Sequence, residues 1–146
     1  MIPRLVLDAS VVLTWFLNAT EEQSRYAEVV AALIERDATT CVVPGLWHIE
    51  VGAQLLKRRS AGELSRVRLN DAIAKLDRLT IETHHVAYDA REIVKLGQRY
   101  QLAGYDAVYF DLAARFGLPI AAIDAGIRTA CENFRVELIS AEKPSS

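Results

Sequence analysis

Two aspartates follow short apolar runs of the kind that form buried strands. Asp8 comes directly after residues 5–7, and Asp124 comes directly after residues 120–123. In an open α/β sheet, ligands bind at the carboxyl ends of the strands. If the two strands are parallel neighbours, both carboxylates point into the same crevice. Taken singly, each aspartate could also be a plain helix N-cap.

Two further acids lie on helical segments, beside apolar residues. Glu50 borders the apolar stripe of a predicted helix over residues 46–59, and Asp106 opens a predicted helix whose same face carries Tyr109 and Phe110. An acid on a core-facing stripe is costly unless it is paired or bound to a metal. Taken singly, Glu50 could extend its carboxylate to solvent or pair with an arginine. Asp106 could be an N-cap or a first-turn acid favoured by the helix dipole.

A divalent cation is the chemical feature that would let these four carboxylates share one crevice. Without it, their like charges would raise each other's pKa values. Mg²⁺ takes oxygen ligands, keeps several waters and suits phosphate substrates. It can activate a water and stabilise charge on a phosphoryl oxygen. The sequence has no His/Cys cluster with zinc-ligand spacing, which argues against zinc. The residues alone therefore predict an acidic metal site.

The elements that must position these acids are visible as short apolar runs alternating with amphipathic stretches. This alternation predicts a single α/β domain with a mostly parallel central sheet flanked by helices on both faces. Strands are predicted over residues 5–7, 40–43, 80–83 and 120–123, with 136–139 as a last edge strand. Helical spacing predicts helices over residues 22–36, 46–59, 64–79, 88–100, 106–116 and 127–134. One apolar face of the helix over residues 46–59 is expected to carry Leu46, Ile49, Ala53 and Leu56. The residues of the helix over residues 64–79 that are expected to face inward are Leu69, Ala72, Ile73 and Leu76.

Length and composition fit one globular domain, which we place over residues 1–141, with a short flexible tail over residues 142–146. The chain has 146 residues, of which 51% are hydrophobic, enough for a full core. Its formal net charge of −2 gives no support to nucleic-acid binding, which usually shows as a basic excess. A polyanionic partner would therefore need a local basic patch and a bound cation.

The cysteines and the apolar runs indicate a cytoplasmic setting. Cys41 and Cys131 both lie in apolar patterns and are interpreted as reduced core residues. The N-terminus lacks a cleavable signal pattern, since Asp8 interrupts it early. The longest apolar runs fall far short of the roughly 20 residues that span a bilayer, so no membrane association is expected.

Four segments, in order, resemble the four motifs of PIN-domain nucleases. They are residues 6–10 (VLDAS), 44–51 (PGLWHIEV), 104–109 (GYDAVY) and 121–127 (AAIDAGI). The acidic positions of these motifs match Asp8, Glu50, Asp106 and Asp124. Order and rough spacing match across nearly the whole chain, from residue 5 to residue 140. Single motifs are weak signals, whereas all four in order at this length are fairly specific.

The compact single-domain form resembles VapC-type toxins of bacterial toxin–antitoxin pairs. This resemblance implies a homodimer, a site for Mg²⁺ or Mn²⁺, and endoribonuclease activity on RNA that stops translation. It also implies a cognate antitoxin that covers the site, often by inserting a basic side chain. By the same resemblance, Asp8, Asp106 and Asp124 would bind the cation, and Glu50 would complete the site or orient the attacking water.

Three residues near the motifs qualify the resemblance. Ser10 matches a small hydroxyl residue that the family often keeps after the first acid. Ala122 is a departure, because relatives often carry Ser or Thr there, and it puts a supporting hydrogen bond in doubt. Asp111 falls where some relatives have a further acid, but at about 100° per residue it points away from the Asp106 face.

Several other residues have two interpretations. The basic residues that would hold RNA could equally form a solvated helix end; they are Lys57, Arg58, Arg59, Arg66 and Arg68. Tyr105, beside Asp106, could stack on a base, although a capping aromatic is the simpler interpretation. His84 and His85 lack paired ligands, so no metal role is expected of them.

Rival functions remain open at the level of sequence. A phosphatase with an aspartate nucleophile commonly carries a second Asp where this chain has Ser10, and a phosphate-receiving signalling domain usually needs paired N-terminal acids, whereas Leu7 precedes Asp8. A catalytically inactive PIN-like binding module is a further alternative. So is a PIN nuclease that works in RNA processing without an antitoxin.

Overall fold

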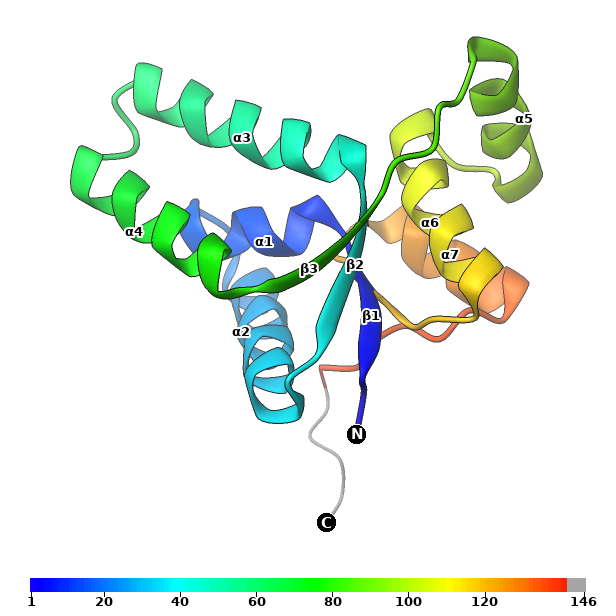
Figure 1. Cartoon of the computed structure of the whole chain (residues 1–146), viewed down its shortest axis with the longest axis horizontal. Coiled ribbons are helices and arrows are strands. Elements are labelled where there is room, and N and C mark those ends of the chain that lie inside the picture. Colours follow the sequence, from blue (N-terminus) through cyan, green and yellow to red (C-terminus); the bar gives the residue numbers. More distant parts are fainter. Residues whose placement is uncertain (142–146) are drawn as a thin grey trace.

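Four short strands form one parallel sheet in the order β3-β2-β1-β4 (Figure 1). They are β1 (Arg4–Leu7), β2 (Thr40–Pro44), β3 (Thr80–His84) and β4 (Ile120–Ala121). The computed structural model describes residues 1–141, so the tail predicted over residues 142–146 lies outside the described residues. Leu5, Val6 and Leu7 in β1 are fully buried, as expected for a central strand with both faces covered.

Helices cover both faces of the sheet, which confirms the predicted fold class. Figure 1 shows α1 to α4 on one side and α5 to α7 on the other. The helices are α1 (Ala9–Phe16), α2 (Glu21–Asp37), α3 (Gly45–Ser60), α4 (Arg66–Arg78), α5 (Ala90–Tyr100), α6 (Gly104–Phe116) and α7 (Ala125–Phe134). Helices α3 and α4 form a hairpin that projects away from the sheet, while α6 packs directly against β1 and β2.

Side-chain caps fix where five of the helices begin. The residue before each of these helices accepts a hydrogen bond from a backbone N–H of the first turn; these residues are Asp8, Thr20, Ser65, Asp89 and Asp124. Such a cap typically contributes about 1 kcal/mol. The N-cap interpretation of Asp8 and Asp124 is therefore correct. A cap bond does not use all the acceptor positions of a carboxylate, so each of these acids can also bind another group.

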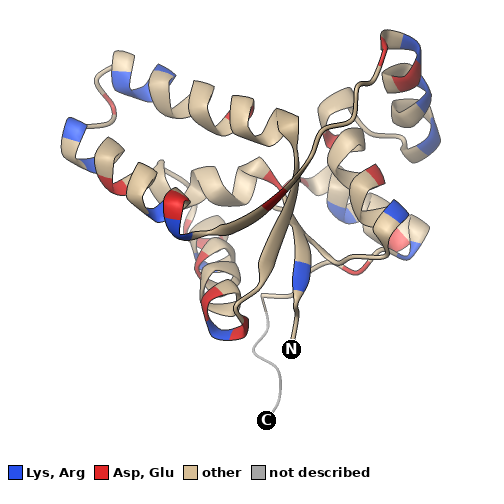
Figure 2. Ribbon diagram, in the orientation of Figure 1, with Lys and Arg blue, Asp and Glu red and all other residues tan. Residues whose placement is uncertain are grey.

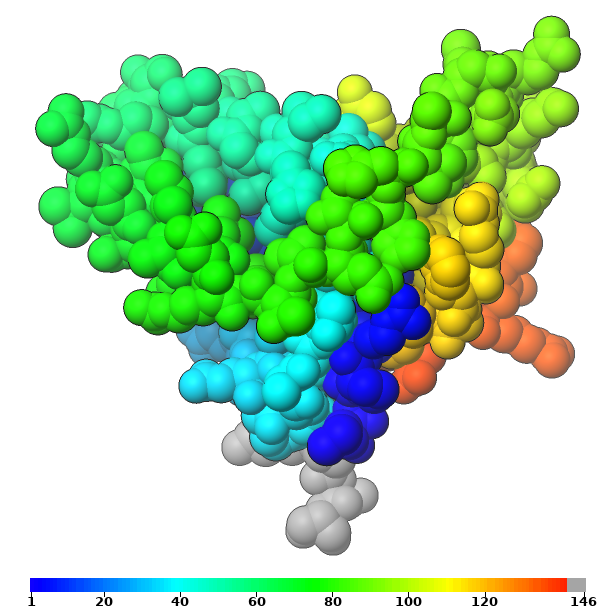
Figure 3. All heavy atoms as spheres, in the orientation of Figure 1, coloured from blue at the N-terminus to red at the C-terminus, as the bar shows by residue number. Residues whose placement is uncertain are grey.

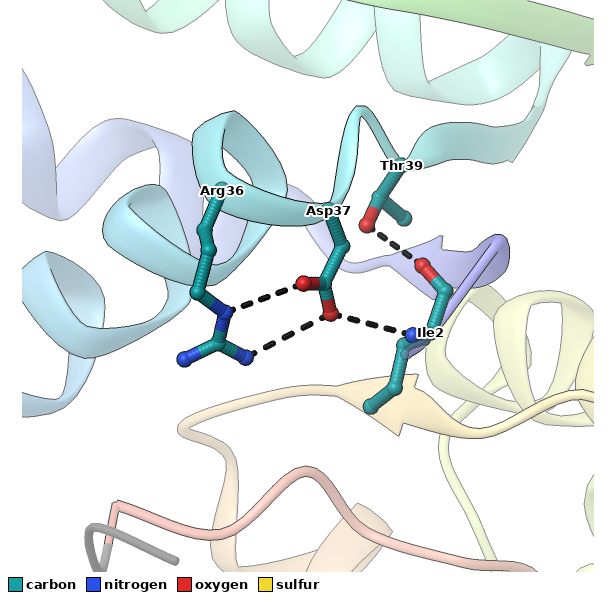
Figure 4. A network of polar contacts seen from close by, with 4 residues as sticks. All are labelled: Ile2, Arg36, Asp37 and Thr39. Carbon is teal, nitrogen blue, oxygen red and sulfur yellow. Dashed lines mark hydrogen bonds and ion pairs between the residues drawn. The ribbon is translucent and has the colours of Figure 1, made fainter.

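A small polar network joins the start of β1 to the end of α2 (Figure 4). The Asp37 carboxylate accepts a hydrogen bond of 3.0 Å from the backbone N–H of Ile2 and one of 2.9 Å from Arg36 Nε, and the Thr39 hydroxyl donates to the Ile2 carbonyl at 2.6 Å. These contacts hold the chain entering β1 beside the chain entering β2. They set the register in which Arg4 pairs with Thr40.

The structure corrects several local predictions. Helix α1 was not predicted, because its sequence is apolar nearly all round and shows no amphipathic period. Strand β4 covers two residues of the predicted 120–123, so Asp124 follows it by a short turn. The predicted edge strand over residues 136–139 is reduced to a single bridge between Ile120 and Leu138.

Three residues expected to face inward are exposed instead. The exposed fractions are 69% for Ile49, 64% for Leu56 and 47% for Ile73. They lie on the α3–α4 hairpin, whose helices contact α1 and each other but do not cover the sheet as broadly as α6 does. The face of α3 that is buried carries Trp47, Val51 and Leu55, so it is a neighbouring face to the predicted apolar stripe.

Candidate active site

The carboxyl ends of β1, β2 and β4 meet at one edge of the sheet, where α1, α3 and α7 begin (Figure 1). The neighbour relation assumed for the first and fourth strands is correct: β1 and β4 are parallel, with Leu7 opposite Ala121. The backbone N–H of Asp8 donates to the Ala121 carbonyl at 3.0 Å, which extends this pairing to the first acid. Asp8 and Asp124 thus follow neighbouring strands.

Asp8 is the most deeply buried of the four acids, with 4% of its surface exposed. Its carboxylate accepts hydrogen bonds from the Ser10 hydroxyl and, at 3.3 Å, from the Ser10 backbone N–H. Burial nevertheless raises the pKa of Asp8 to about 6, the Ser10 bonds oppose this, and the charges of Asp106 and Glu50 add to it. Burial thus makes the charged form of Asp8 unfavourable in spite of its two hydrogen bonds, and a cation would stabilise it.

Ser10 links the ends of the first and fourth strands. Its hydroxyl donates to Asp8 and accepts a hydrogen bond of 3.4 Å from the backbone N–H of Ile123. The sequence raised doubt about this region because Ala122 lacks a hydroxyl. The backbone N–H of Ala122 is instead satisfied by the Tyr26 hydroxyl at 3.3 Å, and its carbonyl accepts a bond of 3.2 Å from Arg128.

Asp124 is held at the N-terminus of α7. One of its oxygens accepts a hydrogen bond of 3.0 Å from the backbone N–H of Ile127. Gly126 makes room for this carboxylate, since a Cβ at that position would lie 3.0 Å from Asp124 Oδ2. The glycine therefore allows the acid to lie close against the first turn of the helix.

Glu50 and Tyr109 connect α3 to α6. The hydroxyl of Tyr109, a nearly fully buried residue, donates to Glu50 Oε1 at 2.7 Å. Partial burial raises the pKa of Glu50, and the bond from Tyr109 lowers it. This contact orients Glu50 toward α6 and shows that it does not extend freely into solvent or pair with an arginine.

Asp106 lies in the first turn of α6 and is half-buried. Burial raises its pKa to about 6, with further increases from the charges of Asp124 and Glu50. Its closeness to both acids, together with the effect of its charge on Asp8, connects all four predicted residues electrostatically. The charges of Asp8, Glu50, Asp106 and Asp124, which come from four different segments, thus affect one another, and we call these four residues the acidic site.

The donor chemistry of this site fits a hard divalent cation, because every candidate ligand is a carboxylate oxygen. Within residues 1–141, however, no three acidic, His or Cys side chains are close enough together to hold one ion as they stand. Direct binding by three of the acids would therefore need side-chain rotation, and waters could complete the coordination, as Mg²⁺ usually requires.

Asp111 does not belong to the acidic site. It is buried, accepts a hydrogen bond from the Tyr100 hydroxyl at 2.9 Å and pairs with Arg115 at 2.9 Å. Its charge is not among those that raise the pKa of Asp8 or Asp106. As predicted from its position on the helix, it faces away from Asp106, and its role is to join α5 to α6.

The predicted basic residues gather at the free end of the α3–α4 hairpin (Figure 2). Three of them are partly engaged within the protein: Arg58 pairs with Glu63 at 2.6 Å, Arg59 donates to the Leu64 carbonyl at 3.3 Å, and Arg68 donates to the Phe16 carbonyl at 3.4 Å. Lys57 and Arg66 are exposed. The cluster is a surface that could hold a polyanion at a distance from the acids.

Tyr109 is a site residue whose role the sequence did not reveal. Its position three residues after Asp106 places it on the same helix face, and that was the only available signal. The bond to Glu50 depends on how α3 and α6 meet beyond the sheet edge. This is a tertiary property that no local pattern encodes.

Comparison with known proteins agrees with the described geometry. A family model for the PIN domain matches residues 5–133. The structure of PAE2754 from Pyrobaculum aerophilum is similar to this chain with a TM-score of 0.54 and 17% sequence identity, over 88% of this chain and 84% of that one. At that identity the likeness concerns the fold alone. No curated protein matches the sequence.

Proposed function

Because the chain belongs to the PIN-domain family, whose members are generally nucleases, we propose that it is a metal-dependent endoribonuclease that hydrolyses RNA phosphodiester bonds. The observation that carries this proposal is the acidic site itself. Asp8, Glu50, Asp106 and Asp124 converge at one sheet edge, and their charges and burial raise the pKa values of three of them. An array that repels its own charges favours a bound cation.

The acidic residues would have two roles, binding of the metal and orientation of the attacking water. Asp8, Asp106 and Asp124 would hold Mg²⁺, or Mn²⁺ in its place, and Glu50 would orient the attacking water. When bound, the ion would neutralise the carboxylates and stabilise charge on a phosphoryl oxygen. Tyr109 fixes one oxygen of Glu50 through its 2.7 Å hydrogen bond, which leaves the other oxygen available to accept a proton from water. Ser10 keeps Asp8 in place by the same kind of contact.

We also propose that the protein is the toxin of a toxin–antitoxin pair, forms a homodimer, and is inhibited by a cognate antitoxin that covers the acidic site. The motif resemblance and the compact single domain support this finer assignment. A cytoplasmic location is supported by Cys41 and Cys131, which are both buried and unpaired. Within residues 1–141 no helix combines the length and hydrophobicity that a membrane crossing requires.

The experiment that tests the nuclease activity compares purified wild type with Asp8→Asn and Asp106→Asn on total bacterial RNA, in Mg²⁺ and in EDTA. We expect discrete fragments from the wild type in Mg²⁺ only, and none from either variant. Asp77→Asn is the matched control, because Asp77 is an exposed acid on α4 outside the site. Absence of cleavage by folded wild type in both Mg²⁺ and Mn²⁺ would favour a non-catalytic binding module.

A second experiment separates a toxin from a nuclease of RNA processing. Expression of the wild type in a bacterium should arrest growth, and Asp8→Asn should not. A small reading frame beside the gene, encoding a protein that restores growth and binds the chain, would establish the antitoxin. Metal-dependent cleavage without growth arrest and without such a neighbour would assign the protein to RNA processing.

A further inference from the structure

A cavity of about 430 Å³ lies beside the acidic site, between the end of β3, the start of α3 and the face of α6 that turns toward α5. Its walls include Leu46, Tyr88, Ile93, Tyr105, Val108 and Leu112. Figure 3 shows the molecule open on this side, with a notch between the start of α3 and α5. Most of the lining is aliphatic or aromatic. His84, the last residue of β3, and His85, which follows it, add polar atoms, and His84 Nε2 already contacts Glu82 at 2.6 Å.

This cavity shares two walls with the acidic site. On α3, Leu46 precedes Glu50 by four residues, so the two lie on the same helix face, about 6 Å apart along the helix axis. On α6, Tyr105 in the cavity wall adjoins Asp106, and Val108 adjoins Tyr109, which bonds to Glu50. An RNA strand whose phosphodiester lies at the acids would thus place a neighbouring nucleotide at the mouth of the cavity.

The cavity has aromatic rings and apolar side chains that nothing within the described chain covers fully. Tyr105 is 64% exposed and Val86 is 44% exposed. Gly45 lets the ring of His85 lie against the start of α3, since a Cβ there would be 3.1 Å from His85 Nδ1. Two exposed rings, Tyr105 and His85, are therefore part of the lining of this mostly apolar pocket.

We propose that this cavity takes one unpaired nucleobase of the RNA, next to the phosphodiester that the acidic site cleaves. The inference rests on the proposed nuclease function and adds to it a binding site for one base of the substrate, at a cavity that the acids themselves do not line. A base has two apolar faces for stacking and a polar edge that could meet the ring nitrogens of His85. A pocket of about 430 Å³ is large enough for a base with its ribose, and a base held in a duplex could not reach into it.

The test maps cleavage sites on total bacterial RNA for wild type, Tyr105→Ala and Tyr105→Phe. We expect the wild type to prefer one type of nucleotide at one position beside the cut, Tyr105→Phe to keep that preference, and Tyr105→Ala to lose it. Base–aromatic stacking predicts that Tyr105→Ala, placed in an Asp8→Asn background, binds a single-stranded oligoribonucleotide of the mapped sequence about 5- to 100-fold more weakly. Val94→Ala is the control: Val94 is 57% exposed on α5 but does not line the cavity, so binding and preference should not change.

The outcomes distinguish failure of this inference from failure of the nuclease proposal. If wild type and Tyr105→Ala cut RNA with the same preference and bind the oligoribonucleotide equally, the cavity does not hold a base and the nuclease proposal stands. Equal cleavage of a fully paired duplex would also overturn the inference. If folded wild type cuts no RNA in Mg²⁺ or Mn²⁺, both the nuclease function and the role of the cavity are contradicted.

A second variant tests a different wall of the cavity. Ile93→Trp fills the cavity and should weaken the nucleotide preference as Tyr105→Ala does.

Discussion

At the scale of single residues, the four acids could be predicted from the sequence, whereas the contacts that hold them could not. The acids stand in recognisable motifs, each beside an apolar run or stripe. The bond from Tyr109 to Glu50 and the bridge from Ser10 to Ile123 join residues that are 59 and 113 positions apart. Such partners depend on the packing of distant segments and leave no local sequence signal.

The burial of Asp8 leads to a prediction about stability. Burial raises its pKa from the ordinary 3.8 to about 6, so between these values the folded metal-free protein keeps a proton that the unfolded chain releases. The free energy of unfolding therefore falls as the pH rises through this window and stays low above it. Asp8→Asn removes the buried charge and still caps α1. We expect the variant to be more stable than wild type at neutral pH in EDTA by about 1–3 kcal/mol, measured by urea denaturation.

Added Mg²⁺ should make wild type more stable than Asp8→Asn. The ion would stabilise folded wild type by mass action and leave Asp8→Asn nearly unchanged. Asp77→Asn, an exposed substitution, should behave as wild type in both conditions. An Asp8→Asn protein that is less stable than wild type in EDTA would show that the Asp8 charge is satisfied without a metal.

The hydrogen bond from Tyr109 leads to a second prediction at this scale. Tyr109→Phe keeps the buried ring and removes the donor, so the pKa of Glu50 should rise further and the residue should lose its orientation. We expect cleavage about 10- to 100-fold slower, with the acidic limb of the pH–rate profile displaced to higher pH.

Tyr100→Phe is the matched control for this experiment. Its hydroxyl also donates to a buried carboxylate, that of Asp111, but away from the acidic site. This variant should lose stability and keep the rate and pH profile of cleavage. Equal pH–rate profiles for Tyr109→Phe and wild type would contradict the orienting role of Tyr109.

At the scale of elements, strand and helix types could be predicted well where an amphipathic period existed. The parallel sheet and its flanking helices follow from the alternation of apolar runs and helical stripes. Helix α1 was not predicted because its sequence is apolar nearly all round. The predicted inward face of α3, with Ile49 and Leu56, is wrong because the helix packs through Trp47, Val51 and Leu55 instead. In both cases the packing against neighbouring elements determines the outcome, and the apolar periodicity of the sequence does not indicate that packing.

The close fit between Gly126 and Asp124 tests how an element end positions the site. In Gly126→Ala, the new Cβ would lie 3.0 Å from Asp124 Oδ2, so the carboxylate must move from its place at the start of α7. We expect weaker Mg²⁺ binding and slower cleavage, each by about 10-fold or more.

Gly52→Ala is the corresponding control, because a Cβ there meets nothing within 4 Å. In the interior of α3 it should raise stability by up to about 1 kcal/mol without changing cleavage. If Gly126→Ala binds Mn²⁺ as tightly as wild type in a titration, the position of Asp124 does not matter for the metal.

At the scale of the whole molecule, a net charge of −2 must coexist with binding of a polyanion. The basic end of the α3–α4 hairpin offers one solution, since it separates cations from the acidic site (Figure 2). Its geometry could not be predicted from the sequence, because nothing there shows that α3 and α4 project together away from the sheet. The homodimer and the antitoxin remain proposals at this scale.

A salt titration tests the role of the hairpin end. Lys57→Ala with Arg66→Ala removes two exposed cations, so the slope of log K against log[salt] for single-stranded RNA should become shallower by roughly 1.4. Binding at low salt should weaken, while Arg25→Ala on α2 should change neither quantity. An unchanged slope would show that Lys57 and Arg66 do not contact the RNA.

The central claim is that Asp8, Glu50, Asp106 and Asp124 form a metal site, and Mn²⁺ binding followed by electron paramagnetic resonance tests it most directly. We predict that wild type takes up Mn²⁺ competitively with Mg²⁺, that Asp77→Asn does the same, and that Asp8→Asn and Asp106→Asn leave most of the Mn²⁺ free at equal concentrations. Equal uptake by wild type and both site variants, or no uptake by folded wild type, would contradict the metal site and with it the proposed hydrolysis.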